Sequence, residues 1–148
     1  MRTKDTYQQP GHLIRRAHQI ATAVFMTEAK AFDLTSVQFA ALIVIRELPG
    51  IDATRVSDLI YFDRSTIGNV LDRLEKKGLI RREPGLEDRR TKRLYLTKQG
   101  SVVLRRIAAK LPRISDTILA PLSPAERVRF MKLMTKLVDA DGRGKPDR

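Results

Sequence analysis

A mainly α-helical fold carrying one small β-hairpin is the fold class that this 148-residue sequence predicts. Apolar residues recur at helical spacing through most of the chain, and two short segments with strand character interrupt them. Hydrophobic residues make up 42% of the chain, which is enough for a real core. A chain of this length is expected to form one domain, extended by helices at its ends.

The first two helices are predicted over residues 10–32 and over residues 36–48. The first follows Pro10 and repeats its apolar residues at helical spacing. The second opens at Thr35, with Gln38 three residues later, which is a capping box. Pro49 and Gly50 end it.

Two further helices follow at close spacing, over residues 52–60 and 64–77. Asp52 is the expected N-cap of the short one, Asp63 caps the longer one, and Gly78 marks its end. Two helices joined by a tight turn are typical of a helix-turn-helix.

A hairpin is predicted next, from the segments LIRREP (79–84) and KRLYLT (92–97), with Pro84 and Gly85 starting the connection. A helix-turn-helix followed by a hairpin is a winged helix. Thr97 caps a long helix over 98–119, in which Pro112 predicts a kink.

The last helix begins at Ser123, with Pro124 and Glu126 as agreeing start signals. Its apolar stripe is too wide for packing on one neighbour, as expected of an interface helix. The stripe consists of Val128, Phe130, Met131, Leu133, Met134, Leu137 and Val138.

Positive charge is concentrated in the middle of the chain. The formal net charge is +12, and residues 61–113, with 15 basic and 6 acidic residues, contribute +9 of it. Residues 1–60 contribute +1 and residues 114–148 contribute +2. Charge that served only solubility would be spread more evenly, so the segment predicts a surface for a polyanion, with nucleic acid first.

Catalytic and metal-binding functions find little support in the composition. There is no cysteine, and both histidines, His12 and His18, lie near the start of the chain. Without a Gly-rich phosphate loop or a metal cluster, no catalytic constellation assembles, and we expect no enzyme, no metal site and no cofactor. No apolar run reaches the roughly 18 residues of a membrane span, and the first ten residues lack a signal peptide's apolar stretch, so we expect a cytoplasmic protein.

The helix over 64–77 has the side chains of a DNA reader. Ile67, Val70, Leu71 and Leu74 fall on one face and are predicted to pack on the core. The opposite face carries residues that contact base edges or phosphates in the major groove, although every exposed helix face is polar. These candidates are Arg64, Ser65, Thr66, Asn69 and Arg73.

The hairpin loop is a candidate for the minor groove, because a thin basic loop enters where a helix does not fit. Its candidate contacts are Asp88, Arg89, Arg90 and Lys92. We expect the Asp88 carboxylate to hold the guanidinium of Arg90 in one rotamer.

These segments together resemble the MarR family of bacterial transcription regulators. DRRTKRLYLTKQG (88–100) is similar to the family's wing signature, Asp-x-Arg followed by Leu-Thr and Gly. LTSVQFAALIVI (34–45) resembles its second helix, and DRSTIGNVLDRLEKKGLIRRE (63–83) its recognition helix and following strand. The resemblance covers roughly residues 10–140.

The resemblance implies an obligate homodimer in which the first and last helices of two subunits interleave. We accordingly expect an N-terminal dimerisation helix over 1–34, a winged helix-turn-helix domain over 35–97, C-terminal dimerisation helices over 98–140 and a disordered tail over 141–148. Two recognition helices would enter successive major grooves about 34 Å apart on a palindromic operator.

The resemblance also implies release of DNA by a small anionic ligand, bound between the dimerisation helices and the winged domain. HLIRRAHQI (12–20) is similar to the first helix of members that respond to aromatic carboxylates and their CoA thioesters. His12, Arg15, Arg16 and Gln19 share one face of this helix and suit a carboxylate or phosphate. A solvated basic helix face is the alternative, and His18 is expected to be a partly buried packing residue.

The function predicted from the sequence is therefore a transcriptional regulator, in the form of a repressor, that binds double-stranded DNA as a homodimer and answers to a small effector. The alternative is an architectural DNA-binding protein that needs no ligand.

Overall fold

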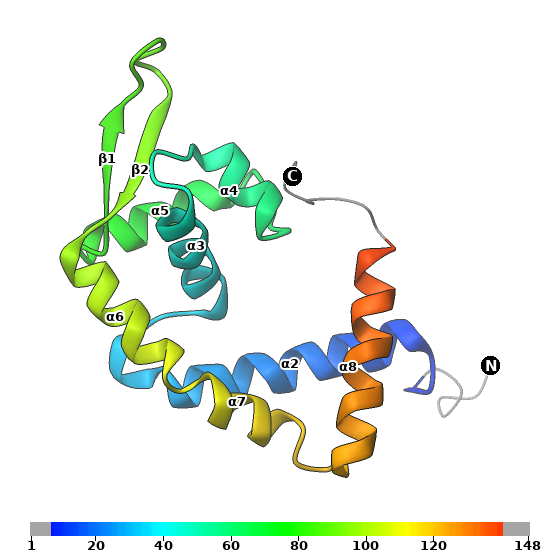
Figure 1. Ribbon diagram of the computed structural model, residues 1–148. Helices are drawn as coiled ribbons and strands as arrows, with labels where there is room; N and C mark the ends of the chain where they lie inside the picture. Colours follow the sequence, from blue (N-terminus) through cyan, green and yellow to red (C-terminus); the bar gives the residue numbers. More distant parts are fainter. Residues whose placement is uncertain (1–6, 141–148) are drawn as a thin grey trace.

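Helices form most of the molecule, and the hairpin projects from them (Figure 1). The computed structural model describes residues 7–140. Its elements, in order, are α2 (Pro10–Glu28), η1 (Lys30–Phe32), α3 (Ser36–Glu47), α4 (Ala53–Leu59), α5 (Ile67–Lys76), β1 (Ile80–Pro84), β2 (Lys92–Leu96), α6 (Lys98–Ala108), α7 (Leu111–Ile118) and α8 (Pro124–Asp139). The predicted fold class is confirmed; the predicted tail over 141–148 lies outside the described residues.

Four predicted helix starts, at Thr35, Asp52, Thr97 and Ser123, are confirmed by their hydrogen bonds. The hydroxyl of Thr35 accepts from the Gln38 N–H at 3.2 Å, while the Gln38 side chain accepts from the Thr35 N–H at 3.1 Å. Ser123 and Glu126 form the same reciprocal pair at the start of α8, while the side chains of Asp52 and Thr97 each accept one backbone N–H at the starts of α4 and α6. Short-range pairs of this kind depend only on neighbouring residues, which is why the sequence predicts them well.

Two predicted helices are divided in the structure. The first ends at Glu28 and continues only as the 3₁₀ turn η1. The helix predicted over 98–119 is broken at residues 109–110, so that α6 and α7 are separate. Pro112 is the second residue of α7, a position at which the backbone N–H has no hydrogen-bond partner within a helix. Pro112 therefore belongs to the start of a helix and does not bend one.

The core is organised around α3, which contacts α2, α4, α5, α6 and β2. Its inward residues, Leu42 and Ile45, are fully buried. Helices α4, α5 and α6 and both strands contribute apolar side chains to the same cluster, among them Val56, Leu71, Leu74, Ile80, Leu94, Leu104 and Ile107. This packing fixes the orientation of α5 and of the hairpin base relative to each other.

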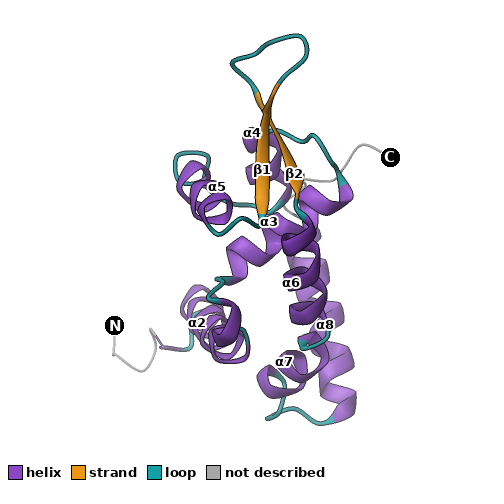
Figure 2. Ribbon diagram, turned by 90° about the vertical axis from the view of Figure 1, so that its left-hand side faces the viewer, coloured by secondary structure: helices purple, strands orange, loops and turns teal. Residues whose placement is uncertain are grey.

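The hairpin pairs β1 with β2 in antiparallel register, with Ile80 opposite Leu96 and Pro84 opposite Lys92. A bridge not predicted from the sequence joins Ile51 to Leu94, through a Leu94 N–H to Ile51 carbonyl bond of 2.9 Å. This bridge attaches the hairpin to the segment before α4. The far end of the hairpin projects beyond the helices (Figure 2).

Helices α2 and α7 form a second layer next to the winged helix-turn-helix. Helix α7 packs against α2, and Glu28 at the end of α2 pairs with Lys110 at 3.6 Å and Arg113 at 3.0 Å. Helix α8 stands at the side of this layer (Figure 1). Over its full length, α8 has no buried residue, although it is rich in apolar side chains. Within residues 7–140 no helix combines the length and the apolar character needed to cross a membrane.

Candidate nucleic-acid interface

The turn between α4 and α5 is held by an ion pair that the sequence did not reveal. Arg64 donates from Nε at 3.0 Å and from Nη2 at 2.8 Å to Oδ1 of Asp58. Both side chains remain well exposed. Arg64, predicted as a free base or phosphate contact, therefore also braces the two helices of the helix-turn-helix.

Helix α5 begins later than predicted, at Ile67 rather than at Arg64. Residues 64–66 form a turn in which the Asp63 carboxylate accepts from the N–H of Ser65 at 3.3 Å and from its hydroxyl. These hydrogen bonds, first of all that from the Ser65 hydroxyl, hold the pKa of Asp63 below its ordinary value. Asp63 thus orders the entry to the helix, and the helix itself has Thr66 in the capping position.

The predicted faces of α5 are borne out by burial. Ile67, Leu71 and Leu74 are buried and Val70 is partly buried. All five predicted major-groove residues, Arg64, Ser65, Thr66, Asn69 and Arg73, are exposed. The structure therefore leaves this face open to a partner.

A cleft of about 360 Å³ lies between the recognition helix and the second layer. Thr66, Asn69 and Arg73 line it from α5, and His18 and Thr22 line it from α2. The cleft is completed by Thr35, Ser36, Val37, Gln38, Phe62 and Val70. Part of the predicted reading face is therefore also the wall of a cavity.

The predicted effector residues do not line this cleft. Arg15, Arg16 and Gln19 are exposed along α2, and the ring of His12 lies 5.0 Å from that of Tyr7, centroid to centroid. His18, which was expected to be partly buried, is exposed and lines the cleft instead. Helical spacing groups residues on a face, but it does not say which face meets the neighbouring domain.

The wing loop is ordered by backbone bonds. Gly85 donates to the carbonyl of Thr91 at 2.8 Å, and Thr91 donates to that of Asp88 at 3.1 Å. The Asp88 carboxylate accepts from the backbone N–H of Arg90 at 2.9 Å, so the expected contact with the guanidinium is corrected to a contact with the main chain. The three basic side chains, Arg89, Arg90 and Lys92, are exposed.

Arg82 braces the wing against the recognition helix. From β1 its Nη1 contacts Asp72 and Glu75 of α5, each at 2.7 Å. Sequence reasoning missed this residue, and the only signal was that Arg82 and two acidic residues fall in neighbouring elements. The arrangement fixes the angle between the two predicted readers of DNA.

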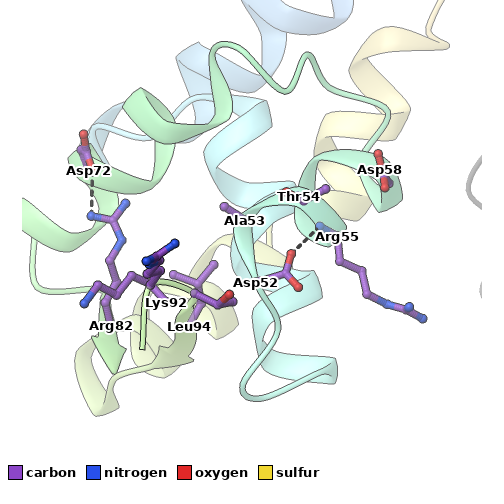
Figure 3. A pocket seen from close by; sticks show the side chains of 11 residues that line it. Asp52, Ala53, Thr54, Arg55, Asp58, Asp72, Arg82, Lys92 and Leu94 are labelled. Carbon is purple, nitrogen blue, oxygen red and sulfur yellow. Dashed lines mark hydrogen bonds and ion pairs between the residues drawn. The ribbon is translucent and has the colours of Figure 1, made fainter. Parts of the chain in front are cut away.

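A groove of about 820 Å³ opens between α4, α5 and the wing (Figure 3). Asp72 and Arg82 meet on one side of the groove, with Lys92 beside them. Arg55 extends from α4, away from these three residues. Arg90 also lines the groove. Two of the four predicted wing residues, Arg90 and Lys92, thus line one groove together with residues of the helix-turn-helix.

Comparison with known proteins places this geometry in a family. A model of the MarR family matches residues 34–92. The chain is 31% identical over 137 residues to the HTH-type transcriptional repressor NicR of Pseudomonas putida, covering 93% of this chain and 87% of that one. It is 32% identical over 131 residues to the transcriptional regulator HosA of Escherichia coli, covering 86% and 93%.

Solved structures agree with these relatives. The PcaV transcriptional regulator of Streptomyces coelicolor, in complex with its natural ligand, has a TM-score of 0.82 and 34% identity, covering 95% of this chain and 99% of that one. BpsR of Bordetella bronchiseptica, whose DNA binding is regulated by 6-hydroxynicotinic acid, has a TM-score of 0.81 and 29% identity, covering 90% and 95%.

Proposed function

The chain belongs to the MarR family of transcription regulators, and we propose that it acts as a homodimeric repressor released from a palindromic operator by a small anionic ligand. The cell compartment we propose is the cytoplasm, where the regulator meets its promoter DNA. Its relatives are named transcriptional repressors and regulators, and we assign no catalytic role.

Two exposed readers support DNA as the partner. Asn69 and Arg73 lie on the open face of α5, and their side chains match adenine and guanine edges in the major groove. Arg90 lies on the projecting wing, where a guanidinium suits the minor groove. The braces at Arg64 and Arg82 hold the two readers at a set angle before DNA arrives, which lowers the entropy lost on binding.

The dimer is supported by α8. Val128 is 72% exposed, and Leu133, Leu137 and Val138 are each more than half exposed, on a helix with no buried residue along its length. An apolar face of this kind is stable in water only when another surface covers it. A second copy of the chain, contributing its own terminal helices, is the cover we propose.

The cleft between α2 and α5 is the observation that carries the proposal of ligand control. His18 and Arg73 bring two basic groups to the cleft from opposite elements, which suits a carboxylate. A molecule bound there contacts Asn69 and Arg73 on the helix that reads DNA. Ligand binding is thereby coupled to the position of that helix.

The ligand class we propose is an aromatic carboxylate or its CoA thioester. The similarity to BpsR supports it, since 6-hydroxynicotinic acid, which regulates the DNA binding of that protein, is itself an aromatic acid. The test is a thermal-shift screen of such compounds, because a ligand that binds only the folded dimer raises its Tm. Hits should also release operator DNA and lose their effect in Arg73→Ala; a panel without hits would favour the ligand-independent architectural alternative.

Sequence reading is tested at Asn69. Asn69→Ala is expected to relax base preference by about 1–3 kcal/mol at one position in each half-site, as measured by competition with single-base operator variants. If the variant weakens binding to every duplex equally, Asn69 contacts only the backbone. Equal affinity of the wild-type protein for all duplexes would contradict the regulator and favour the architectural protein.

A further inference from the structure

Gly68 leaves a gap among the side chains at the start of the recognition helix. Residues four apart share a helix face, so Gly68 falls in line with Asp72, while Arg64 lies in the turn before the helix. Arg64 is held by Asp58 of α4 at 2.8 Å, and Asp72 is held by Arg82 of β1 at 2.7 Å. Gly68, between these two residues in the chain, has no side chain, while the side chains of both are fixed by ion pairs.

Gly68 lies one helical turn before a residue that lines the groove between α4, α5 and the wing. That residue is Asp72, and Asp58 and Arg82 line the groove with it, whereas Gly68 itself is not part of the lining. Figure 3 shows Asp58 and Asp72 on the two sides of the groove. Gly68 itself is exposed, and a Cβ at this position would meet no atom within 4 Å.

The fold does not require glycine at this position. Gly68 is not among the described residues with positive φ, and open space surrounds it. Gly100 is the contrasting case, because a Cβ there would lie 2.1 Å from the carbonyl oxygen of Leu79. Since glycine in a helix is less stable than alanine, Gly68 lowers the stability of the free protein without any packing reason.

The groove has the electrostatics of a site for a polyanion. Its carboxylates are already engaged: Asp52 caps α4, Asp58 holds Arg64, and Asp72 holds Arg82. On the wing side, Arg90 and Lys92 line the groove, and neither forms an ion pair with another residue between 7 and 140. The wing side of the groove therefore offers two cations that are not paired with a carboxylate of the described residues.

We propose that one DNA strand runs through this groove and that Gly68 is the point where its sugar–phosphate backbone lies directly against α5. This rests on the proposed DNA-binding function. Phosphates meet the cations of the wing side, and the missing side chain lets the strand approach the helix to van der Waals distance. Any side chain at position 68 would hold the strand away from the reading face.

The test compares Gly68→Ala with Gly11→Ala. Gly11 is also the second residue of a helix and is also exposed, and a Cβ added there would likewise meet no atom within 4 Å. Both substitutions are expected to raise Tm by about 2–4 °C. Gly68→Ala should in addition weaken operator binding by about 5- to 150-fold, because the added methyl group would be forced into a packed contact with the DNA. Gly11→Ala should leave operator binding unchanged.

The readouts are melting temperature and fluorescence anisotropy with a labelled operator, at protein concentrations where light scattering gives the same oligomer for all three proteins. If Gly68→Ala is more stable than wild type and binds the operator equally well, the proposal is overturned, while the proposed function as a regulator is unaffected. A wild-type protein that binds no duplex would overturn both. A fall in Tm for Gly68→Ala would overturn the premise that the gap is open.

A small free anion is the other occupant that this chemistry admits, and a separate titration distinguishes it. The probe is inorganic phosphate, added to wild type and to Lys92→Gln in the absence of DNA. A phosphate-dependent rise in Tm that Lys92→Gln abolishes, together with normal operator binding by Gly68→Ala, would assign the groove to a free anion and overturn the DNA track.

Discussion

One aspartate orders the backbone at each of the two predicted DNA readers. Asp63 accepts from the N–H of Ser65, and Asp88 accepts from that of Arg90, so each bonds two residues ahead. This is the local pattern that favours aspartate in turns. The carboxylate thereby shapes the loop while the basic side chains remain available to phosphate.

Arg90→Ala is the substitution expected to show that the wing touches DNA. Loss of one phosphate-type contact should weaken operator binding and reduce the slope of log K against log salt by about 0.9. Anisotropy titrations at several salt concentrations measure both. Arg105→Ala, which removes an equal charge from the exposed side of α6, is the control and should leave the slope unchanged.

Gly100→Ala should destabilise the protein, in contrast to the other helical glycines. Its new Cβ would lie 2.1 Å from the Leu79 carbonyl and 2.8 Å from a methyl of Leu96, so α6 must move away from the base of the hairpin. We expect a loss of about 1–3 kcal/mol in the free energy of unfolding, measured by urea denaturation. Unchanged stability would mean that α6 shifts without cost.

At the scale of elements, ion pairs with two other segments locate the recognition helix. Lys77, after the end of α5, donates to the carboxylate of Asp33 at 2.8 Å and to the carbonyl of the same residue. Arg82 connects β1 to Asp72 and Glu75. The helix is therefore attached at its C-terminal half to the segment before α3 and to the wing.

The Asp33 attachment should give the stability a pH dependence at acid pH. The hydrogen bond from Lys77 and the charge of its ammonium hold the pKa of Asp33 below its ordinary 3.8. A depressed folded-state pKa contributes stability above 3.8 that is lost as the pH falls through the folded-state value.

Asp33→Asn tests this without disturbing the backbone, because asparagine also tolerates the left-handed conformation of φ 49° at this residue. Wild type should have the higher Tm at neutral pH, and the difference should disappear below the folded-state pKa. The attachment is small, because it lies in solvent. A difference that stays constant down to acid pH would contradict the ion pair.

For the whole molecule, the apolar core is formed within the single chain, whereas apolar faces of the terminal helices remain uncovered. The core lies around α3 and also includes Phe25 of α2 and Ile114 of α7. The apolar residues of α8 are exposed in the single chain, and α2 also exposes Leu13, Ile14 and Ile20. The two unsatisfied faces lie in the segments predicted to form the dimer.

Leu133→Asp is expected to break that dimer, because a carboxylate placed in an apolar interface must lose its hydration. Light scattering should report the mass of one chain for the variant and of two chains for wild type. Palindromic operator binding should weaken, since one chain reaches only one half-site. Lys132→Ala, at the neighbouring exposed position, is the control and should remain a dimer. If Leu133→Asp is also a dimer, α8 does not form this interface.

Much of the fold was predictable because its signals are local. The capping box at Thr35 and Gln38, the cap at Thr97 and the antiparallel hairpin all follow from residues close together in the chain. The family resemblance rested on the same kind of signal. The start of α5 was misplaced by three residues, because Asp63 caps a turn that precedes the helix and the sequence does not separate the two.

The candidate site was predictable in composition but not in arrangement. The sequence by itself determined the helix order, the wing and the chemistry of the residues exposed on each, because periodicity and capping act over a few residues. Only the tertiary structure decided that Arg64 is held by Asp58, that Arg82 braces the wing, and that His18 rather than His12 meets the cleft. Those contacts depend on the angles at which helices pack, and packing angles are set by the whole core together.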